Sequence, residues 1–438
     1  MIDIHKRIST AQALKKKVGS EVVLAGWAAD VKCLGQVAFI RLRDRDGYVQ
    51  LVASAGFKQF NEIEKIPLES VILAKGKVQK SKLKGGGNEV KLQELQVLSK
   101  AEPKLPIDMS GKIKTDLSKR LDWRFLDLRS PRHLAIFKIQ SEFEAGLRDW
   151  FLKNGFIEIH TSKLVSQATE SGASVFPVVY FSKKAFLAQS PQFYKQMALA
   201  AGFDRVFEIG PAFRAELHHT PRHLCEYTSI DLELAFIKDY EDIMQVHEQL
   251  LVHALKHVAL VCKRELAQLG CKVKIPKIPF PRITMAQAYK LLQKAGKKIP
   301  IGTELDPEGE KLLSEIVKKK YGHEFVFLTE FPWATAPFYH MRKAGDSKWT
   351  CRADLIWNGL EITTLSQREH RYDVLIKQCK EKGLRPKDFE FYLNFFRYGC
   401  PVHGGGGTGI ERLTTQLLGL ENIRESTFTP RDPERLLP

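Results

Sequence analysis

Apolar and polar residues alternate in two neighbouring segments near the middle of the chain, residues 213–216 and 229–236. A period of two residues is typical of half-buried β-strands. The polar loop between the two segments contains Arg222 and His223. We therefore predict an antiparallel hairpin over residues 210–237. Its polar face and loop offer charges that suit an anionic ligand bearing an ammonium group, although solvated surface charges would produce the same pattern.

Alternating segments also fill the first hundred residues. Short apolar runs bounded by turn residues predict five strands, with a hairpin turn at Asp46 and Gly47. The predicted strands span residues 21–28, 37–43, 48–53, 70–78 and 89–98. Five short strands with Gly-rich connections favour a small all-β barrel of the OB kind over residues 1–100.

The alternation separates an apolar face of this barrel from a mixed one. The mixed face carries Phe39, Arg41, Arg43, Tyr48 and Gln50. An aromatic ring among arginines and an amide suits stacking on single-stranded bases. A second core layer would also place Phe39 on a strand, so both interpretations stay open at this point.

The rest of the chain predicts a hinge and a large second domain. Residues 101–133 are mixed, charged and interrupted by prolines, which fits a linker. Apolar residues recur at helical spacing over residues 134–154, and a strand follows at 156–160. A chain of 438 residues exceeds what one core usually serves, so residues 134–438 are assigned to a separate domain.

Composition narrows the class of protein. The chain has 68 Lys and Arg against 51 Asp and Glu, a formal charge of +17, which favours a polyanionic partner. Seven scattered cysteines form no CxxC pair, so a reducing cytoplasm is expected and no zinc ribbon or disulfide framework is indicated. A signal peptide and an apolar run of about 18 residues are both missing, so we expect no membrane association.

The segment GGGGTGIER at residues 404–412 contains the pattern GxGxxG. A dinucleotide-binding fold needs a βαβ unit and an acidic ribose partner after this pattern, and the chain ends too soon after Gly409 to supply them. A Walker-type phosphate loop also fails, because no Gly-Lys-Ser or Gly-Lys-Thr follows. Ile410, Leu413 and Leu417 instead predict a helix that begins directly after the glycines.

Two carboxylates, Asp354 and Glu361, flank a strand-like apolar run. Carboxylate oxygens near a triphosphate are ligands that Mg²⁺ prefers, with water kept in the remaining positions. They are therefore candidate metal ligands.

FRAE at residues 213–216, followed by RHL, CEY and SIDLE, resembles the second conserved motif of class II aminoacyl-tRNA synthetases. The form is that of aspartyl-tRNA synthetases of the archaeal and eukaryotic type. Residues 134–160 resemble the first motif, which builds the dimer interface, and residues 404–412 resemble the third. The resemblance covers about residues 20–438. It implies an α+β fold, in which an OB barrel precedes an antiparallel catalytic sheet of six or seven strands flanked by helices.

The resemblance also implies an aspartate pocket lined by QSPQFYKQ, residues 189–196. Lys195 and Arg368 would bind the side-chain carboxylate of the substrate, because two fixed cations favour a carboxylate over the amide of asparagine. The other residues implied to bind aspartate are Glu170, Gln192, Arg214, Asp231 and Thr364.

For ATP, the resemblance implies that Arg214 and Arg412 are the catalytic cations. Mg²⁺ would be held by Asp354, Glu361 and Thr364. The implied ATP contacts are Arg214, Glu216, Arg222, His223, Leu224, Glu361, Gly409, Ile410, Glu411 and Arg412. In the barrel, Phe39 and Gln50 match the family's anticodon contacts by their spacing of eleven positions.

The implied function is ATP-dependent activation of L-aspartate to aspartyl-adenylate and its transfer to the 3′ end of tRNA(Asp) by a cytoplasmic homodimer. Charging of tRNA(Asn) is left open, since that choice is expected to lie in barrel loops near Ala29 and residues 80–87. The alternatives are an asparaginyl-tRNA synthetase and a catalytically inactive RNA-binding relative.

Three positions depart from the family's pattern. Ser162 replaces a proline, a change that we expect to soften the dimer interface. Leu365 and Ser366 replace two small residues near Arg368, and we expect their added bulk to change the shape of the pocket or the rate.

Overall fold

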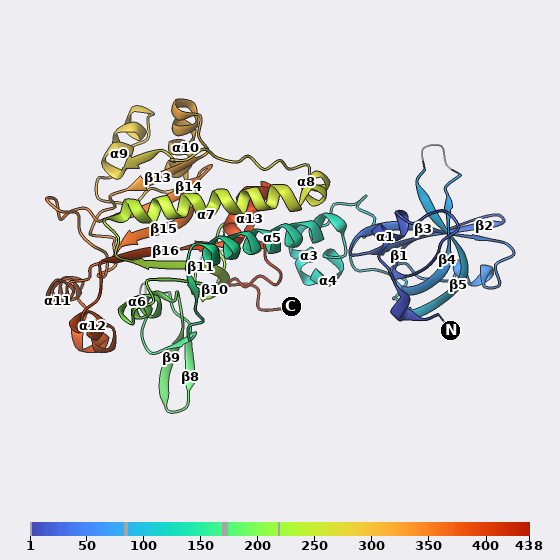
Figure 1. Ribbon diagram of the computed structural model, residues 1–438, viewed down its shortest axis with the longest axis horizontal. Helices are drawn as coiled ribbons and strands as arrows, with labels where there is room; N and C mark the ends of the chain where they lie inside the picture. Colours follow the sequence, from blue (N-terminus) through green and yellow to red (C-terminus); the bar gives the residue numbers. More distant parts are fainter. Residues whose placement is uncertain (1, 83–85, 169–173, 218–219) are drawn as a thin grey trace. The chain divides into compact units, whose positions relative to one another are not determined.

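The computed structural model describes residues 2–82, 86–168, 174–217 and 220–438. The chain divides into two units, residues 1–134 and residues 135–437 (Figure 1). Each unit has its own hydrophobic core, one inside the N-terminal barrel and the other around the large sheet.

The first unit is built on a closed barrel with strand order β1-β2-β3-β5-β4. Its strands are β1 (Glu21–Leu34), β2 (Val37–Asp44), β3 (Gly47–Ser54), β4 (Val71–Lys80) and β5 (Asn88–Ser99). Ile40, Leu42 and Leu51 are fully buried inside it, as their alternation predicts. The five predicted strands are confirmed.

Short helices complete this unit. They are η1 (Ile4–Lys6), α1 (Thr10–Leu14), α2 (Phe60–Ile63), α3 (Leu117–Asp122) and α4 (Arg124–Asp127). Helix α1 begins with a capping box in which the side chains of Ser9 and Gln12 each accept from the other's backbone N–H. Residues 101–133 thus contain helical turns within a mostly irregular segment.

The second unit is built on an eight-stranded sheet with order β12-β13-β14-β15-β16-β11-β10-β6. Its strands are β6 (Ile157–Glu158), β10 (Arg205–Phe213), β11 (Glu226–Ala235), β12 (Arg282–Thr284), β13 (Phe325–Thr329), β14 (Arg352–Trp357), β15 (Leu360–Gln367) and β16 (His403–Gly409). The sequence led us to expect six or seven antiparallel strands. The short edge strands β6 and β12 pair in parallel and raise the number to eight.

Helices and a small second sheet surround the large sheet. The helices are α5 (Pro131–Lys153), α6 (Gln192–Ala200), α7 (Tyr240–Val261), α8 (Lys263–Leu269), α9 (Met285–Lys294), α10 (Pro307–Tyr321), α11 (Tyr372–Glu381), η2 (Pro386–Phe389), α12 (Glu390–Arg397), α13 (Ile410–Leu418) and η3 (Ile423–Ser426). The small sheet comprises β7 (Leu164–Val165), β8 (Pro177–Tyr180) and β9 (Lys183–Leu187).

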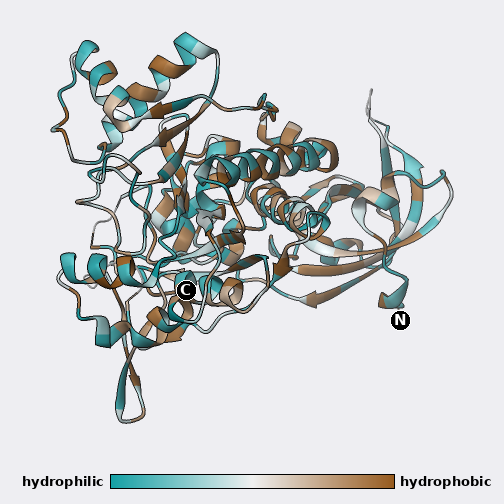
Figure 2. Ribbon diagram, turned by 60° about the vertical axis from the view of Figure 1, so that its left-hand side comes forward, coloured by the Kyte–Doolittle hydropathy of each residue, from teal (hydrophilic) through white to brown (hydrophobic). Residues whose placement is uncertain are grey.

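Helices α5, α7 and α13 lie over one face of the large sheet (Figure 1). The hydropathy colours of these helices mix along their length, as expected of helices with one buried side (Figure 2). Phe143 and Phe151 of α5 pack there with Leu255 of α7 and Leu232 of β11. The opposite face of the sheet is therefore the one available for a ligand.

The predicted hairpin over residues 210–237 is confirmed as strands β10 and β11, with Glu208 opposite Asp231. One detail of that prediction is wrong. We expected the polar side of the second strand to be exposed, whereas Asp231 and Glu233 are buried along with the apolar residues between them. Strand β11 lies inside the sheet and is covered on both faces.

All seven cysteines are free thiols. Within the described residues, no helix combines the length and the apolar character that crossing a membrane requires.

Candidate active site

A cavity of about 410 Å³ opens on the face of the sheet that carries Asp231 and Thr364. Most of the predicted site residues line it, namely Gln192, Lys195, Arg214, Glu216, Arg222, His223, Leu224, Asp231, Glu361, Thr364, Arg368, Gly409, Glu411 and Arg412. Ile410 is the first residue of α13 and is buried in the core, and Asp354 is not among the lining residues. Glu170 lies outside the described residues.

At one end of the cavity, Lys195 of α6 meets two carboxylates of β11. Its Nζ lies 2.8 Å from Oδ1 of Asp231 and 3.3 Å from Oε2 of Glu233, and it donates to the backbone oxygen of Gly406. Lys195 is only 2% exposed. Buried charges of this kind are tolerated because they are paired.

Arg368 stands beside this pair on the other side of Glu233. Its Nε and Nη2 donate to the two carboxylate oxygens of Glu233 at 2.9 and 3.2 Å. Burial opposes ionisation of Glu233, but the charges of Arg368 and Lys195 outweigh it and lower the pKa of this carboxyl. Glu233 therefore holds both cations of the predicted carboxylate pocket in one network.

Sequence reasoning did not single out Glu233. It lies two residues after Asp231, in a strand whose other side carries Ile230, Leu232 and Leu234. The alternation pattern alone predicts that Glu233 faces solvent. Only the structure shows that both faces of the sheet are covered at β11, so that this carboxylate needs a cationic partner.

Leu365 does not enter the cavity, which corrects our expectation of a reshaped pocket. Its side chain is fully buried in the core cluster on the other face of β15. It faces Gly406 of β16, where a Cβ would lie 2.6 Å from Cδ2 of Leu365 and 2.1 Å from the backbone oxygen of Thr364. The glycine leaves room for the leucine. Ser366 is also buried, and its Oγ accepts from Nη1 of Arg368 at 2.6 Å.

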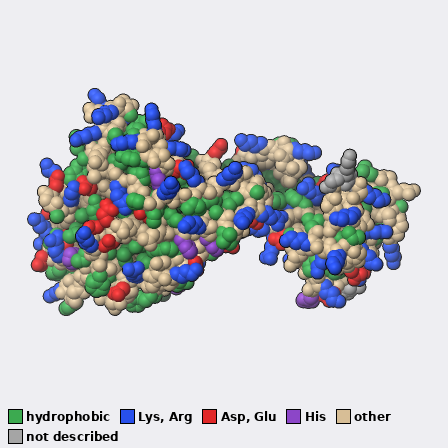
Figure 3. Space-filling model, turned by 45° about the horizontal axis from the view of Figure 1, so that its top comes forward, with side chains coloured by type: hydrophobic (Ala, Val, Ile, Leu, Met, Phe, Trp, Pro, Cys, Tyr) green, Lys and Arg blue, Asp and Glu red, His purple; other side chains and the backbone are tan. Residues whose placement is uncertain are grey.

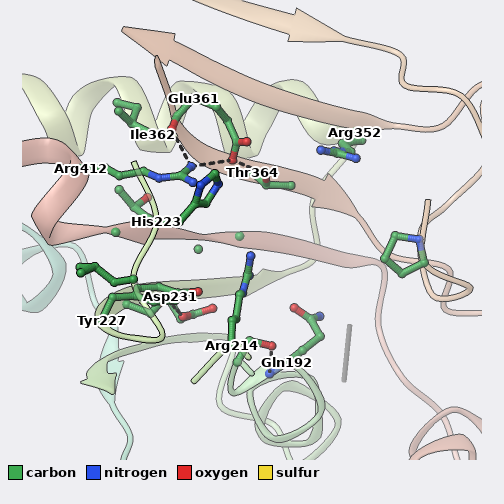
Figure 4. A pocket seen from close by; sticks show the side chains of 18 of the residues that line it. Gln192, Arg214, His223, Tyr227, Asp231, Arg352, Glu361, Ile362, Thr364 and Arg412 are labelled. Carbon is green, nitrogen blue, oxygen red and sulfur yellow. Dashed lines mark hydrogen bonds and ion pairs between the residues drawn. The ribbon is translucent and has the colours of Figure 1, made fainter. Parts of the chain in front are cut away.

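Arg214 follows β10 directly and reaches into the middle of the cavity (Figure 4). Its guanidinium carbon lies 5.6 Å from the centre of the Tyr227 ring. Its backbone N–H donates to the backbone oxygen of Cys225 at 2.9 Å. This bond links the end of β10 to the start of β11. The hairpin thus fixes the base of this side chain and leaves the guanidinium in the cavity.

Arg412, His223 and Glu361 group at the other end of the cavity (Figure 4). Nη1 of Arg412 donates to the backbone oxygen of Glu361 at 2.8 Å and lies 3.6 Å from its carboxylate, which also accepts from Thr364. Burial would raise the pKa of Glu361, but the nearby arginines, Arg412 first, lower it. Burial and then Arg412 lower the pKa of His223, so its imidazole is neutral at pH 7.

The predicted metal ligand Asp354 is engaged by an arginine. Both of its oxygens accept from Arg352, at 2.9 and 2.7 Å, and Arg352 also pairs with Glu304 at 2.7 Å. Burial raises the pKa of Asp354; Arg352 opposes this and the charge of Glu361 adds to it. The oxygens of Asp354 and Glu361, two carboxylates that repel each other, fit the oxygen ligands that Mg²⁺ requires.

The described residues contain no group of three or more His, Cys, Asp or Glu placed to hold a metal by themselves. This still fits Mg²⁺, which is usually held by one or two carboxylates together with substrate phosphates and water.

Glu411 lies in the first turn of α13 and lines the cavity. One of its oxygens accepts from the backbone N–H of Thr228 at 3.0 Å, and the other is buried without a partner among the described residues. Burial raises its pKa to about 7.

In the barrel, Phe39 of β2 and Gln50 of β3 lie on one face of neighbouring strands, because Arg41 is opposite Gln50 in the register. Phe39 is half-buried and lies outside the barrel core. Gln50 donates to Glu89 at 3.0 Å, which fixes the orientation of its amide. The two predicted anticodon contacts are therefore brought together.

Other members of this mixed barrel face differ from the prediction. Arg43 is buried and pairs with Glu69 at 2.5 Å, so it is not part of an exposed platform. Arg41 stacks over the Tyr48 ring at 3.9 Å. The aromatic and cationic face that remains is therefore made by Phe39, Arg41 and Tyr48.

Comparison with known proteins adds to this geometry. The model of the family "tRNA synthetases class II (D, K and N)" matches residues 116–433, and that of the OB-fold nucleic acid binding domain matches residues 22–98. The aspartate–tRNA(Asp) ligase of Thermococcus kodakarensis is 48% identical over 427 residues, which cover 96% of this chain and 97% of that protein. The aspartate–tRNA(Asp/Asn) ligase of Methanopyrus kandleri is 46% identical over 98% of this chain and 99% of that protein.

Among solved structures, the asparaginyl-tRNA synthetase of Pyrococcus horikoshii complexed with asparaginyl-adenylate superposes with a TM-score of 0.92. It is 32% identical, and the match covers 100% of both chains. The architecture of both units therefore recurs in a protein that holds an aminoacyl-adenylate.

Proposed function

The chain belongs to the class II tRNA synthetases of the D, K and N group, with an OB-fold anticodon-binding domain, and from this premise we propose that it is an aspartate–tRNA ligase. It would activate L-aspartate with ATP and transfer it to the 3′ end of tRNA(Asp). The proposal rests on the chemistry of the amino-acid end of the cavity, because the family alone admits aspartate, asparagine and lysine.

The observation that carries the proposal is the buried ion pair of Lys195 with Asp231, 2.8 Å long. Aspartate brings both an ammonium group and a side-chain carboxylate. Its ammonium group would pair with Asp231 and its carboxylate with Lys195, so every buried charge keeps a partner. Asparagine has the ammonium group but no side-chain carboxylate, so Lys195 would lose Asp231 without a replacement and keep only Glu233 as its anionic partner. Separating a buried pair in this way costs about 3–5 kcal/mol.

Activation of aspartate would need no protein nucleophile. An oxygen of the substrate α-carboxylate attacks the α-phosphorus of ATP, the bond to the bridging oxygen breaks, and pyrophosphate leaves. Arg214 reaches into the middle of the cavity and would stabilise the charge that grows on the α-phosphate. Arg412 and neutral His223 would contact the departing pyrophosphate. Catalysis is then positioning and electrostatics.

Mg²⁺ would be held by Glu361, Asp354 and the hydroxyl of Thr364, with phosphate oxygens of ATP as further ligands. When bound, it supplies positive charge to the polyphosphate. For Asp354 to serve, its oxygens must be shared between the metal and Arg352.

The tRNA would contact both units. Phe39 and Gln50 would take anticodon bases by stacking and hydrogen bonding, and the terminal ribose hydroxyl would attack the aspartyl-adenylate in the cavity. Lys and Arg side chains are spread over the face of the molecule in Figure 3, as expected for a partner bound largely through phosphates. We further propose a cytoplasmic homodimer that uses α5 and the segment around Ser162.

The two relatives differ in the tRNA for which they are named. The protein from T. kodakarensis is named for tRNA(Asp), and the protein from M. kandleri is named for tRNA(Asp/Asn). For this chain we propose tRNA(Asp) as the acceptor and leave tRNA(Asn) to be decided by experiment.

ATP–pyrophosphate exchange with aspartate and with asparagine tests the proposal. We expect aspartate-dependent exchange and little exchange with asparagine. Preference for asparagine would identify an asparaginyl-tRNA synthetase, and no exchange with any amino acid would identify an inactive relative. Charging of purified tRNA(Asp) and tRNA(Asn) with aspartate then determines the acceptor.

A further inference from the structure

The guanidinium of Arg368 makes at least five hydrogen bonds, as many as it has N–H groups. Besides the two bonds to Glu233, Nη1 donates to Oγ of Ser366 at 2.6 Å and lies 3.3 Å from Nε2 of His340. Nη2 also donates to Oε1 of Gln192 at 3.1 Å. A substrate carboxylate must therefore replace some of these partners.

The partners fall into two groups by their place. Glu233 and Ser366 are completely buried and do not line the cavity, so they hold the guanidinium from behind. Gln192 and His340 line the cavity, and both are neutral acceptors. An incoming carboxylate reaches only the second group.

We propose that Ser366 is a positioning residue that fixes Arg368 from behind, and that His340 is a specificity residue that holds the cavity-facing N–H of Nη1 until a substrate carboxylate replaces it. This inference rests on the proposed aspartate activity and goes beyond it. It assigns a role to Ser366, which the sequence showed only as a departure from the family's pattern, and to His340, which the sequence motifs did not indicate.

His340 is suited to this role by its chemistry. An arginine N–H can only donate, so Nε2 of His340 must accept, and the ring proton is assigned to Nδ1. That nitrogen is buried without a partner among the described residues. Burial and then the charge of Arg368 hold the pKa of His340 well below its usual value. The imidazole is therefore a neutral acceptor that does not compete with a carboxylate by charge.

Discrimination follows from the exchange of partners. A carboxylate adds an opposite charge and a bidentate geometry that a neutral acceptor of the guanidinium lacks. Aspartate therefore gains when it replaces His340 and Gln192. Asparagine offers a neutral oxygen, so it would exchange one neutral acceptor for another and gain almost nothing. Replacing His340 would therefore favour the binding of aspartate and not the binding of asparagine.

The first test is Ser366→Ala in the full-length protein, measured by aspartate-dependent ATP–pyrophosphate exchange. Loss of the rear hydrogen bond should raise KM for aspartate about tenfold, with kcat and KM for ATP changed less than about twofold. Ser366→Cys, which keeps the size and a weak acceptor, should give an intermediate KM and also serves if the alanine variant does not fold. An unchanged KM for aspartate in either folded variant overturns the role of Ser366.

Thr363→Ala is the matched control. Thr363 is on the same strand, is equally buried, and its hydroxyl bonds His247 and Thr408 on the other face. We expect a loss of thermal stability with KM for aspartate unchanged. A rise in KM equal to that of Ser366→Ala would show that both changes act through strand stability, and would overturn the inference.

Unlike Ser366→Ala, His340→Ala should leave the affinity for aspartate intact and weaken the discrimination against asparagine. With one N–H of Arg368 left unpaired in the free enzyme, KM for aspartate should not rise, and the ratio of kcat/KM for aspartate over asparagine should fall about tenfold. His340→Gln, which restores a neutral acceptor, should recover the ratio. A ratio unchanged in His340→Ala, or a KM raised as in Ser366→Ala, would overturn the role of His340.

The wild-type protein separates this inference from the proposed function. If it shows no aspartate-dependent exchange, both fail together. If it shows such exchange and the variants do not behave as described, only the roles of Ser366 and His340 fail.

Discussion

The two ends of the cavity differ in the pKa shifts of their buried carboxylates. At the amino-acid end, Lys195 and Arg368 lower the pKa of Glu233, and the buried anions and cations pair with one another. At the nucleotide end, burial raises the pKa of Asp354 and Glu411, whereas Arg412 and the other nearby arginines outweigh burial and lower the pKa of Glu361. The first end is balanced before any substrate arrives, whereas the second contains carboxylates that a further cation would favour.

This difference indicates how each end recognises its ligand. At the amino-acid end, a ligand must supply an opposite charge for each buried group whose ion pair it separates. This requirement selects the amino acid by its charges. The nucleotide end offers cations to phosphates and carboxylates to a metal, which is a condition of charge stabilisation during reaction. Selection of the amino acid and stabilisation of the transition state are thus separated within one cavity.

The largest effect that would test this comparison is expected from Glu233→Gln. The variant keeps the shape of the side chain but leaves Lys195 and Arg368 short of a buried anion. We expect the second unit to lose roughly 3–5 kcal/mol of stability, measured as a shift of its unfolding transition in urea.

Asp388→Asn provides the comparison for that variant, because Asp388 forms an exposed ion pair with Arg385. Its loss should cost less than about 1 kcal/mol. Equal effects of the two variants would show that the Glu233 network is not the buried, balanced element that we describe.

Arg214→Ala should have the next largest effect, and it should act on rate. Removing a cation from the α-phosphate position should lower kcat of ATP–pyrophosphate exchange by about 10²–10³. Arg205→Ala, at the exposed first position of the strand β10 that precedes Arg214, should retain the exchange. Full exchange activity of the Arg214 variant would remove this residue from the mechanism.

Glu411→Gln tests the nucleotide end through pH. The pKa of Glu411 is raised from 4.5 to about 7 in the folded protein, so the folded state holds this proton more tightly. Its contribution to stability is fully present below pH 4.5 and is lost as the pH rises through 7. Relative to the glutamine variant, the wild type should lose roughly 3 kcal/mol between pH 4.5 and 8.

Unfolding curves of both proteins at a series of pH values measure this difference without any ligand. Parallel stability profiles would mean that Glu411 ionises normally, and the contrast between the two ends would then rest on Asp354 alone.

Phe39→Ala should have the smallest effect. Because Phe39 lies in the barrel, this variant should leave both ends of the cavity unchanged. Loss of one stacked base costs about 1–3 kcal/mol, so KM for tRNA in aminoacylation should rise about tenfold or more. Aspartate-dependent exchange should stay at the wild-type level. An equal loss in both reactions would contradict the anticodon role.

Most of the fold and much of the cavity could be predicted from the sequence. The barrel strands and the β10–β11 hairpin have clear alternation, and the motif around Lys195 and Arg368 indicated two residues that the structure brings to one cavity. Strand β6 lies within the strand predicted at residues 156–160, but the three residues of β12 are too few for a pattern to stand out, and the sheet is larger than predicted.

Other features depend on packing between distant segments. The alternation pattern could not show that strand β11, which carries Glu233, is covered on both of its faces. The added bulk of Leu365 could be judged only once the register placed it opposite Gly406. Arg43 has the same strand spacing as Arg41, and only the position of Glu69 shows that it is buried in an ion pair.

The central claim is that the buried cations at 195 and 368 select a carboxylate. Competitive inhibition by the non-reactive sulfamoyl analogues of aspartyl-adenylate and asparaginyl-adenylate tests it directly, because the two ligands differ only in the group that meets these cations. We predict that the aspartyl analogue inhibits ATP–pyrophosphate exchange with an affinity about 100-fold higher or more. Equal affinities, or tighter inhibition by the asparaginyl analogue, would contradict the claim.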